Sequence, residues 1–348
     1  MANPILVEVT RGESVESVHR GAVAVARADG TIVFALGDIE RPTYPRSSLK
    51  PIQALSLLES GAADVFQLGD EEIALACASH SGEPMHTSRV AAWLKQIGCS
   101  EADLACGPQA VRYEPVWVEM LRHGYRPTRI HNNCSGKHTG FLTVCRHWNV
   151  ATEGYERHDH PLQRAVAQTL AELAGISPDM PWGIDGCAAP NFLLPLAAFA
   201  RALAKLADPR VLSDQRAGAA RRIVRAMIAH PELVAGTGRS DTILMQSCGG
   251  RAATKAGAEA FYAGIVPEAG LGIALKIDDG AGRAAETAFA ALLDKLGLLG
   301  DDRAARDLVR APVLNTRGAI VGERRAAPAL RDAGIETLPL PSTTTDGS

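Results

Sequence analysis

The chain of 348 residues lacks any uninterrupted apolar run of about 18 residues, the length that a transmembrane helix needs. Its first residues, Met1-Ala2-Asn3-Pro4, also lack the basic segment and apolar core of a secretory signal peptide. Together, these two absences predict a soluble, cytoplasmic protein.

An excess of charge of one sign is also missing. The formal net charge is −3, and the basic residues are scattered except for a cluster at Arg221, Arg222 and Arg225. Such a balance gives no reason to expect nucleic acid or an anionic membrane as a partner.

The cysteines do not form the pattern of a disulfide framework. There are seven of them, an odd number, and they are dispersed: Cys77, Cys99, Cys106, Cys134, Cys145, Cys187 and Cys248. Without a signal peptide, this distribution argues against structural disulfides and predicts that most of the thiols are buried. A functional cysteine therefore has to be recognised from its neighbours.

The pattern of apolar residues predicts strands at both ends of the chain and helices between them. Hydrophobic residues make up 46% of the chain and charged residues 22%, enough for a large buried core. Strand patterns lie at 5–9, 21–26 and 32–36, with an Asp29-Gly30 hairpin turn, and again at 259–266 and 271–277. Helical patterns begin at Ser47 and follow at 71–78, 87–97, 115–123, 136–147, 161–174, 191–207, 213–229 and 281–297.

This order of elements predicts an α+β fold with an antiparallel central sheet flanked by helices and interrupted by a helical insertion. We expect one domain over residues 1–340. Its sheet comes from about 1–46 and 240–340, and its helical region from about 47–235. The tail, 341–348, is rich in serine and threonine and is expected to be disordered.

A serine and a lysine stand three residues apart at the first predicted helix start. Ser47 and Lys50 would lie on one face of that helix, with Pro51 tolerable in its first turn. A lysine whose pKa is lowered toward about 7–8 can remove the proton of a serine hydroxyl, and the helix N-terminus favours an anionic intermediate. Taken alone, the motif is common and more often marks a capping serine and a solvated lysine.

Three further segments are more polar than helix ends require: residues 77–83 (CASHSGE), 131–140 (HNNCSGKHTG) and 185–190 (DGCAAP). With 45–50 (PRSSLK) and 254–259 (TKAGAE), they resemble the rhizobial-type, class 3 L-asparaginases of the asparaginase II family. The resemblance runs from Val7 to about Leu340, and HNNCSGKH is its most specific element. It implies a serine β-lactamase/glutaminase-like fold and a homodimer.

The resemblance also implies roles for individual residues. Ser47 matches the nucleophile and Lys50 its partner, while Ser79 and Lys255 match a second Ser-Lys pair facing the same site. The zinc ligands of the family correspond to Cys134, Lys137 and Cys187, with the Asp185 carboxylate beside them. Candidate substrate-binding residues are Arg46, His80 and Asp185, although Arg46 could instead contact backbone carbonyls, and His80, like His131 and His138, also fits a structural role.

Zinc is chemically credible at such a cluster, because thiolate is a soft donor and zinc accepts mixed sulfur, nitrogen and oxygen ligands. Lysine is an unusual ligand, since its amine must lose a proton to coordinate. Spacing alone would favour His138 over Lys137, and two buried thiols without a metal remain the alternative.

The predicted activity is hydrolysis of the side-chain amide of L-asparagine to L-aspartate and ammonia by Ser-Lys nucleophilic catalysis. Alternatives are a zinc-dependent amidohydrolase, a glutaminase and a zinc-stabilised binding protein. A β-lactamase or peptidase would need a Lys-Thr-Gly strand, and the nearest match is Lys255-Ala256-Gly257. Residues 236–241 (GTGRSD) form a polar loop that could contact substrate or be a plain turn.

Overall fold

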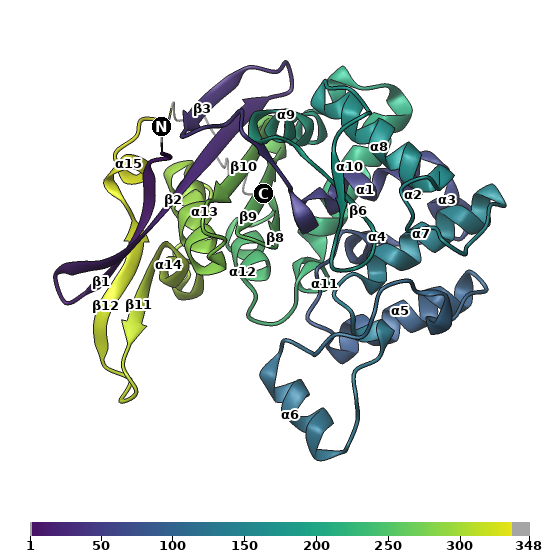
Figure 1. The fold of residues 1–348 in the computed structure, drawn as a ribbon, viewed down its shortest axis with the longest axis horizontal. Helices are drawn as coiled ribbons and strands as arrows, with labels where there is room; N and C mark the ends of the chain where they lie inside the picture. Colours follow the sequence, from purple (N-terminus) through teal and green to yellow (C-terminus); the bar gives the residue numbers. More distant parts are fainter. Residues whose placement is uncertain (1, 336–348) are drawn as a thin grey trace, which may run out of the picture.

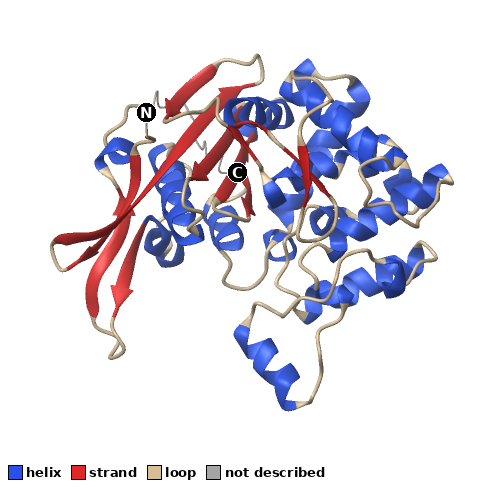
Figure 2. Ribbon diagram, viewed as in Figure 1, coloured by secondary structure: helices blue, strands red, loops and turns tan. Residues whose placement is uncertain are grey.

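The computed structural model describes residues 2–335 as a large antiparallel sheet with helices packed on both faces, so the predicted α+β class is confirmed (Figure 1, Figure 2). The sheet has eight strands in the order β11-β12-β1-β2-β10-β9-β8, with β3 also paired to β2. Their bounds are β1 Ile5–Arg11, β2 Ser14–Arg27, β3 Ile32–Leu36, β8 Ala253–Gly257, β9 Phe261–Val266, β10 Leu271–Ile277, β11 Arg310–Leu314 and β12 Ile320–Ala326. The predicted tail at 341–348 lies outside the described residues.

The long strand β2 joins the two parts of the sheet. Its first half pairs with β1, and its second half lies between β10 and β3. The predicted hairpin around Asp29-Gly30 is confirmed, with Val23 opposite Leu36 in an antiparallel pair. The antiparallel pairing of β9 with β10 is confirmed as well.

Residues between β3 and β8 form the helical part on the right of Figure 1. Its helices are α1 Lys50–Gln53, α2 Leu55–Glu59, α3 Ala62–Val65, α4 Asp70–Ala76, α5 Pro84–Gln96, α6 Glu114–Arg122, α7 Ser135–Trp148, α8 Pro161–Ala174, α9 Leu196–Ala207, α10 Asp214–Ala229, α11 Pro231–Val234 and α12 Ser240–Ser247. Helices α13 Gly282–Lys295, α14 Arg303–Val309 and α15 Pro328–Arg331 follow β10.

Two predicted helices begin differently in the structure. The one expected at 191–207 starts at Leu196, because the preceding residues form short strands: β4 Pro42–Thr43 pairs with β7 Leu194–Pro195, and β5 Trp182–Ile184 with β6 Pro190–Phe192. The one expected from Ser47 is broken into a 3₁₀ turn, η1 Arg46–Leu49, followed by α1 and α2.

The two faces of the sheet are covered by different helices because side chains alternate along each strand. In β2, Ala22, Ala24 and Ala26 face α9 and the helical part, whereas Val23 and Val25 face α13. The small side chains let α9 approach closely: a Cβ on Gly272 of β10 would lie 2.2 Å from the Ala200 carbonyl oxygen. This contact fixes the helical part against the strands that carry the site.

Within residues 2–335, none of the helices combines the length and the apolar character that a membrane crossing requires.

Candidate active site

Ser47 lies in a strained turn at the boundary between the sheet and the helical part. The preceding Arg46 has φ of 51°, a left-handed conformation that is uncommon for a residue with a Cβ and is often found at functional sites. The first hydrogen bond of the turn runs from the Ser48 N–H to the Pro45 carbonyl at 3.1 Å, so the N–H of Ser47 lies before it. The half-buried Ser47 hydroxyl makes no hydrogen bond within residues 2–335.

Ser48 attaches this turn to the edge strand β8. Its hydroxyl is fully buried and donates to the Lys255 carbonyl at 2.7 Å. A Cβ on Gly257 would lie 2.5 Å from the Pro45 carbonyl oxygen, which shows how closely the turn and the strand meet. Ser48 therefore acts as a structural link that holds Lys255 beside Ser47.

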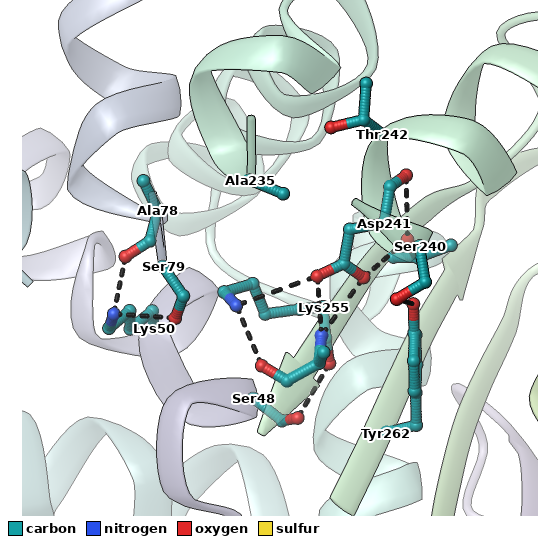
Figure 3. A network of polar contacts seen from close by, with 12 residues as sticks. Ser48, Lys50, Ala78, Ser79, Ala235, Ser240, Asp241, Thr242, Lys255 and Tyr262 are labelled. Carbon is teal, nitrogen blue, oxygen red and sulfur yellow. Dashed lines mark hydrogen bonds and ion pairs between the residues drawn. The ribbon is translucent and has the colours of Figure 1, made fainter. Parts of the chain in front are cut away.

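The side chain of Lys50 reaches past its own turn to the segment after α4. Its amine donates to the Ala78 carbonyl at 2.5 Å and to the Ser79 hydroxyl at 2.9 Å (Figure 3). Among the described residues, no hydrogen bond joins Lys50 to Ser47. The amine is 1% exposed, so the contact with Ser79 is shielded from water.

Lys255 is the second buried amine of the site, and it is also 1% exposed. Burial lowers its pKa to about 7, and the positive charges of Lys50 and Arg239 act in the same direction. The Asp241 carboxylate opposes this shift. A lysine with a pKa near neutrality can exchange a proton at physiological pH.

Asp241, which sequence reasoning missed, is the carboxylate that faces Lys255. It is 1% exposed and lies 3.9 Å from the Lys255 amine. Its oxygens accept hydrogen bonds from the Thr254 hydroxyl (2.9 Å) and from the Ala256 N–H (2.9 and 3.0 Å), and these contacts hold it rigidly under the amine (Figure 3). The sequence could have indicated Asp241, because it is an acidic residue in the first turn of a helix that follows a glycine-rich loop.

The thiols predicted to bind zinc lie together at the start of α7. The Lys137 amine is 3.0 Å from the sulfur of Cys187, and all three ligand candidates are buried. The interaction between the two thiols raises the pKa of Cys134 and lowers that of Cys187. Burial lowers the pKa of Lys137, but the negative charges at Cys187, Cys134 and Asp185, with the hydrogen bond to Cys187, together outweigh burial and the net shift is upward. The cluster thus has the character of a thiolate beside an ammonium.

Two thiols and a neighbouring nitrogen are donors of the kind that zinc accepts. Within residues 2–335, no group of three His, Cys, Asp or Glu side chains is placed to hold a metal, so two cysteines need a donor of another kind. His138 is a neighbour with one ring nitrogen engaged and one free. Its Nδ1 lies 2.6 Å from the Tyr155 hydroxyl, and its buried Nε2 has no hydrogen-bond partner among the described residues. The third donor, Lys137 or His138, stays a prediction.

The candidate substrate-binding residues already have partners inside the protein. The Arg46 guanidinium donates to Asp185 at 2.8 and 3.2 Å, and this bond raises the pKa of Arg46. His80 is buried, with Nε2 2.9 Å from the Ser135 hydroxyl and Nδ1 accepting the Gly82 N–H. The substrate-binding roles of Arg46, Asp185 and His80 remain predictions.

The charges of the serine-lysine network and of the cysteine cluster influence each other. The charge of Lys50 lowers the pKa of Cys134, and that of Cys187 raises the pKa of Arg46, so these groups feel one another's fields. A cavity of about 320 Å³ reaches Arg46, but its lining includes none of the four serine and lysine candidates.

The family comparison bears directly on this arrangement. A profile described as L-asparaginase II matches residues 7–326. The chain belongs to the L-asparaginase II family. The resemblance stated from the motifs is confirmed, and membership makes the protein an amidohydrolase of the asparaginase type with a small-molecule substrate.

Other comparisons give only distant similarities. A search of the curated proteins gives no match. Among solved structures, a β-lactamase from Mycobacterium bovis matches with a TM-score of 0.42 and 15% identity, over 79% of this chain and 94% of the other. A mutant of simvastatin synthase from Aspergillus terreus matches with a TM-score of 0.37 and 13% identity, over 83% and 88% of the two chains.

Proposed function

We propose that this member of the L-asparaginase II family hydrolyses the side-chain amide of L-asparagine with Ser47 as the nucleophile. The observation that carries the proposal is the pair of buried amines, Lys50 and Lys255, within reach of one serine turn. Only one buried carboxylate, Asp241, faces Lys255. Burial without full charge compensation favours a neutral lysine, and a neutral amine is what serine activation needs.

Ser47 is a better nucleophile candidate than Ser79. Its hydroxyl is half-buried and makes no internal hydrogen bond, so it is free to face a substrate. Ser79 is 5% exposed and already accepts from Lys50. We assign Ser79 as a proton relay between the two amines and Ser47.

In the first step, the Ser47 oxygen attacks the amide carbon as its proton passes to Lys255, through Ser79. The Ser47 N–H, which precedes the first hydrogen bond of its turn, is placed to stabilise the oxyanion. The carbon–nitrogen bond then breaks, and the lysine returns the proton to the leaving nitrogen, which departs as ammonia. The product left on the protein is an aspartyl ester of Ser47.

In the second step, a water molecule attacks the ester carbonyl while Lys255 takes one of its protons. The ester bond breaks, Ser47 regains its proton, and L-aspartate leaves. One neutral lysine therefore acts as base and then acid in each half of the reaction.

We further propose a zinc ion bound by Cys134, Lys137 and Cys187, next to the Arg46–Asp185 pair. Such an ion supplies positive charge that can orient a substrate, and it rigidifies the segments that carry these ligands. The serine-lysine chemistry does not need a metal-bound hydroxide. All seven cysteines are free thiols, which fits a cytoplasmic protein, and we retain the homodimer as part of the proposal.

The test is ammonia release from L-asparagine by the wild-type protein and by Ser47→Ala. The variant should lose at least about 10³-fold in kcat while keeping its thermal unfolding temperature, since only an unbonded hydroxyl is removed. Ser56→Ala is the matched control, because the Ser56 hydroxyl bonds only to the Gln53 carbonyl, and it should keep its activity. Substantial activity in Ser47→Ala would overturn the assignment.

The rival reading, a zinc amidohydrolase in which metal-bound water attacks directly, gives the opposite pattern. Complete removal of zinc would abolish that reaction, whereas the serine mechanism should retain turnover with a weaker KM. L-glutamine tested alongside L-asparagine decides between asparaginase and glutaminase activity.

A further inference from the structure

Two arginines beside the site have no partner for their charge. Arg239 is half-buried, and its Nη1 is shut off from solvent without a hydrogen-bond partner. Arg112 is more exposed at the rim. Within residues 2–335, neither guanidinium forms a hydrogen bond or an ion pair. A buried donor on a charged group is costly to leave unpaired, so this guanidinium is suited to bind an anionic group.

Arg239 is held next to the catalytic candidates by its own loop. The segment before it is tied to the site by the Ser79 N–H, which donates to the Val234 carbonyl at 2.9 Å. Thr237 donates to both oxygens of the buried Glu83, at 2.9 Å through its N–H and 2.7 Å through its hydroxyl.

Only glycine fits at position 236 in this loop. Gly236 has φ of 125°, and a Cβ there would lie 2.5 Å from the Ser81 hydroxyl oxygen and 2.6 Å from a Glu83 carboxylate oxygen. These restraints fix where the Arg239 side chain leaves the backbone, two residues before Asp241.

Arg112 approaches the segment of Ser79 and Ser81 from another part of the chain, the loop before α6. Its N–H donates to the Ser81 carbonyl at 2.9 Å, which sets its backbone two residues from Ser79. The surrounding protein and then the charge of Arg239 lower the pKa of Arg112, so the two guanidiniums repel each other. The charge of Arg239 also reaches Lys255. Both arginines are thus carried by segments that hydrogen-bond to the segment of Ser79, Ser81 and Glu83.

Arg46, the arginine next to Ser47, differs from them in that its charge is already compensated. Asp185 accepts two of its N–H donors, as described above. A substrate carboxylate would have to displace Asp185 from Arg46, whereas at Arg239 it would fill an empty donor site.

We propose that Arg239, with Arg112 at the rim, binds the carboxylate of the substrate and so restricts the protein to amides that carry an anionic group. This assignment rests on the proposed asparaginase activity and names the residues that select its substrate. A guanidinium holds a carboxylate through two parallel N–H donors and fixes its orientation. Anchored in this way, asparagine would present its side-chain amide to Ser47 in a single orientation.

The test compares L-asparagine with 3-aminopropanamide, which is asparagine without its carboxylate. Arg239→Gln should raise KM for asparagine about 10- to 100-fold, as expected for losing hydrogen bonds to a charged group, with a smaller change in kcat. At a pH well above the pKa of Lys255, where this lysine is neutral in both proteins, kcat/KM for 3-aminopropanamide should stay near the wild-type value, so the variant loses the preference for the anionic substrate. Arg239→Lys should restore part of the loss, because it keeps the charge.

Arg221→Gln is the control, since Arg221 is an exposed arginine of α10 with no ion pair among the described residues. It removes the same charge and should leave both substrates unaffected. Equal losses on both substrates in Arg239→Gln, or a shifted pH profile with an unchanged KM, would overturn the inference by showing a structural or electrostatic role.

Binding of L-aspartate, measured by calorimetry, separates this inference from the proposed reaction. If the wild-type protein releases no ammonia from asparagine, the proposed function fails. Aspartate binding that is lost in Arg239→Gln and kept in Arg221→Gln would still support the carboxylate site. Equal binding by all three proteins would refute it.

Discussion

Replacing Asp241 with asparagine tests how the site sets the proton affinity of Lys255. The substitution removes the one carboxylate charge that raises the pKa of this lysine, 3.9 Å from its amine. The amide oxygen can still accept from Thr254 and Ala256, so the local packing is kept. We expect the pKa of Lys255 to fall below its value of about 7.

The size of the effect follows from the distance. Two unit charges about 4 Å apart interact by about 4 kcal/mol at an effective dielectric constant of about 20. One pKa unit corresponds to about 1.4 kcal/mol, so the upper limit is a shift of about 3 units. Rearrangement and water entry will reduce it, and a shift of about 1–2 units is the expected range.

The assay is kcat/KM for ammonia release as a function of pH. A lysine that acts as a base works in its neutral form, so activity should rise with pH through a midpoint near 7 in the wild-type protein. In Asp241→Asn the midpoint should move to lower pH. Simple loss of a catalytic group would instead lower the activity without this shift of the midpoint. Asp64→Asn is the control. It removes the exposed carboxylate that pairs with Arg222, and it should leave the midpoint in place. A midpoint that is unchanged or higher in Asp241→Asn would refute the role of Lys255 as the base.

Two further predictions concern the metal and the loop that carries Arg239. Purified protein should contain zinc by mass spectrometry of metals; Lys137→Gln should lose it and His138→Gln should keep it, and the reverse result would make the histidine the ligand. Gly236→Ala should lower the free energy of unfolding in urea by at least about 2 kcal/mol, because of its left-handed φ and its contact with Ser81. Gly218→Ala in α10, where a Cβ meets nothing within 4 Å, should be neutral or stabilising, and equal effects of the two changes would contradict the packing argument.

The alternating pattern of buried residues predicted the central strands and their turns. Strands β11 and β12 escaped prediction because they are only partly buried and carry charges: β11 reads RAPVL and β12 reads IVGERRA. Strand β11 lies at the edge of the sheet and β12 is next to it, and exposed strands of this kind lack the clean alternation on which sequence reasoning depends. Helix α12 was missed for a related reason, since its glycine-rich entry looked like a plain turn.

For the site, the sequence indicated which residues belong together but not which of them touch. The i, i+3 spacing of Ser47 and Lys50 predicted a shared face, and the 3₁₀ turn before α1 is compatible with that. It could not predict the partners of the Lys50 amine, because Ala78 and Ser79 lie on a segment that only the tertiary fold brings near. Asp241 and Arg239 could not be singled out, because their significance comes from burial and from missing partners.

Trapping of the acyl-enzyme is the most direct measurement of the central claim. Protein mixed with labelled L-asparagine and quenched rapidly in acid should carry an aspartyl group on one tryptic peptide. The peptide that begins at Ser47 extends to Arg89, because Pro51 follows Lys50, and it contains both Ser47 and Ser79. Fragmentation should place the aspartyl group on Ser47. A group on Ser79, or turnover with no covalent intermediate, would contradict the account.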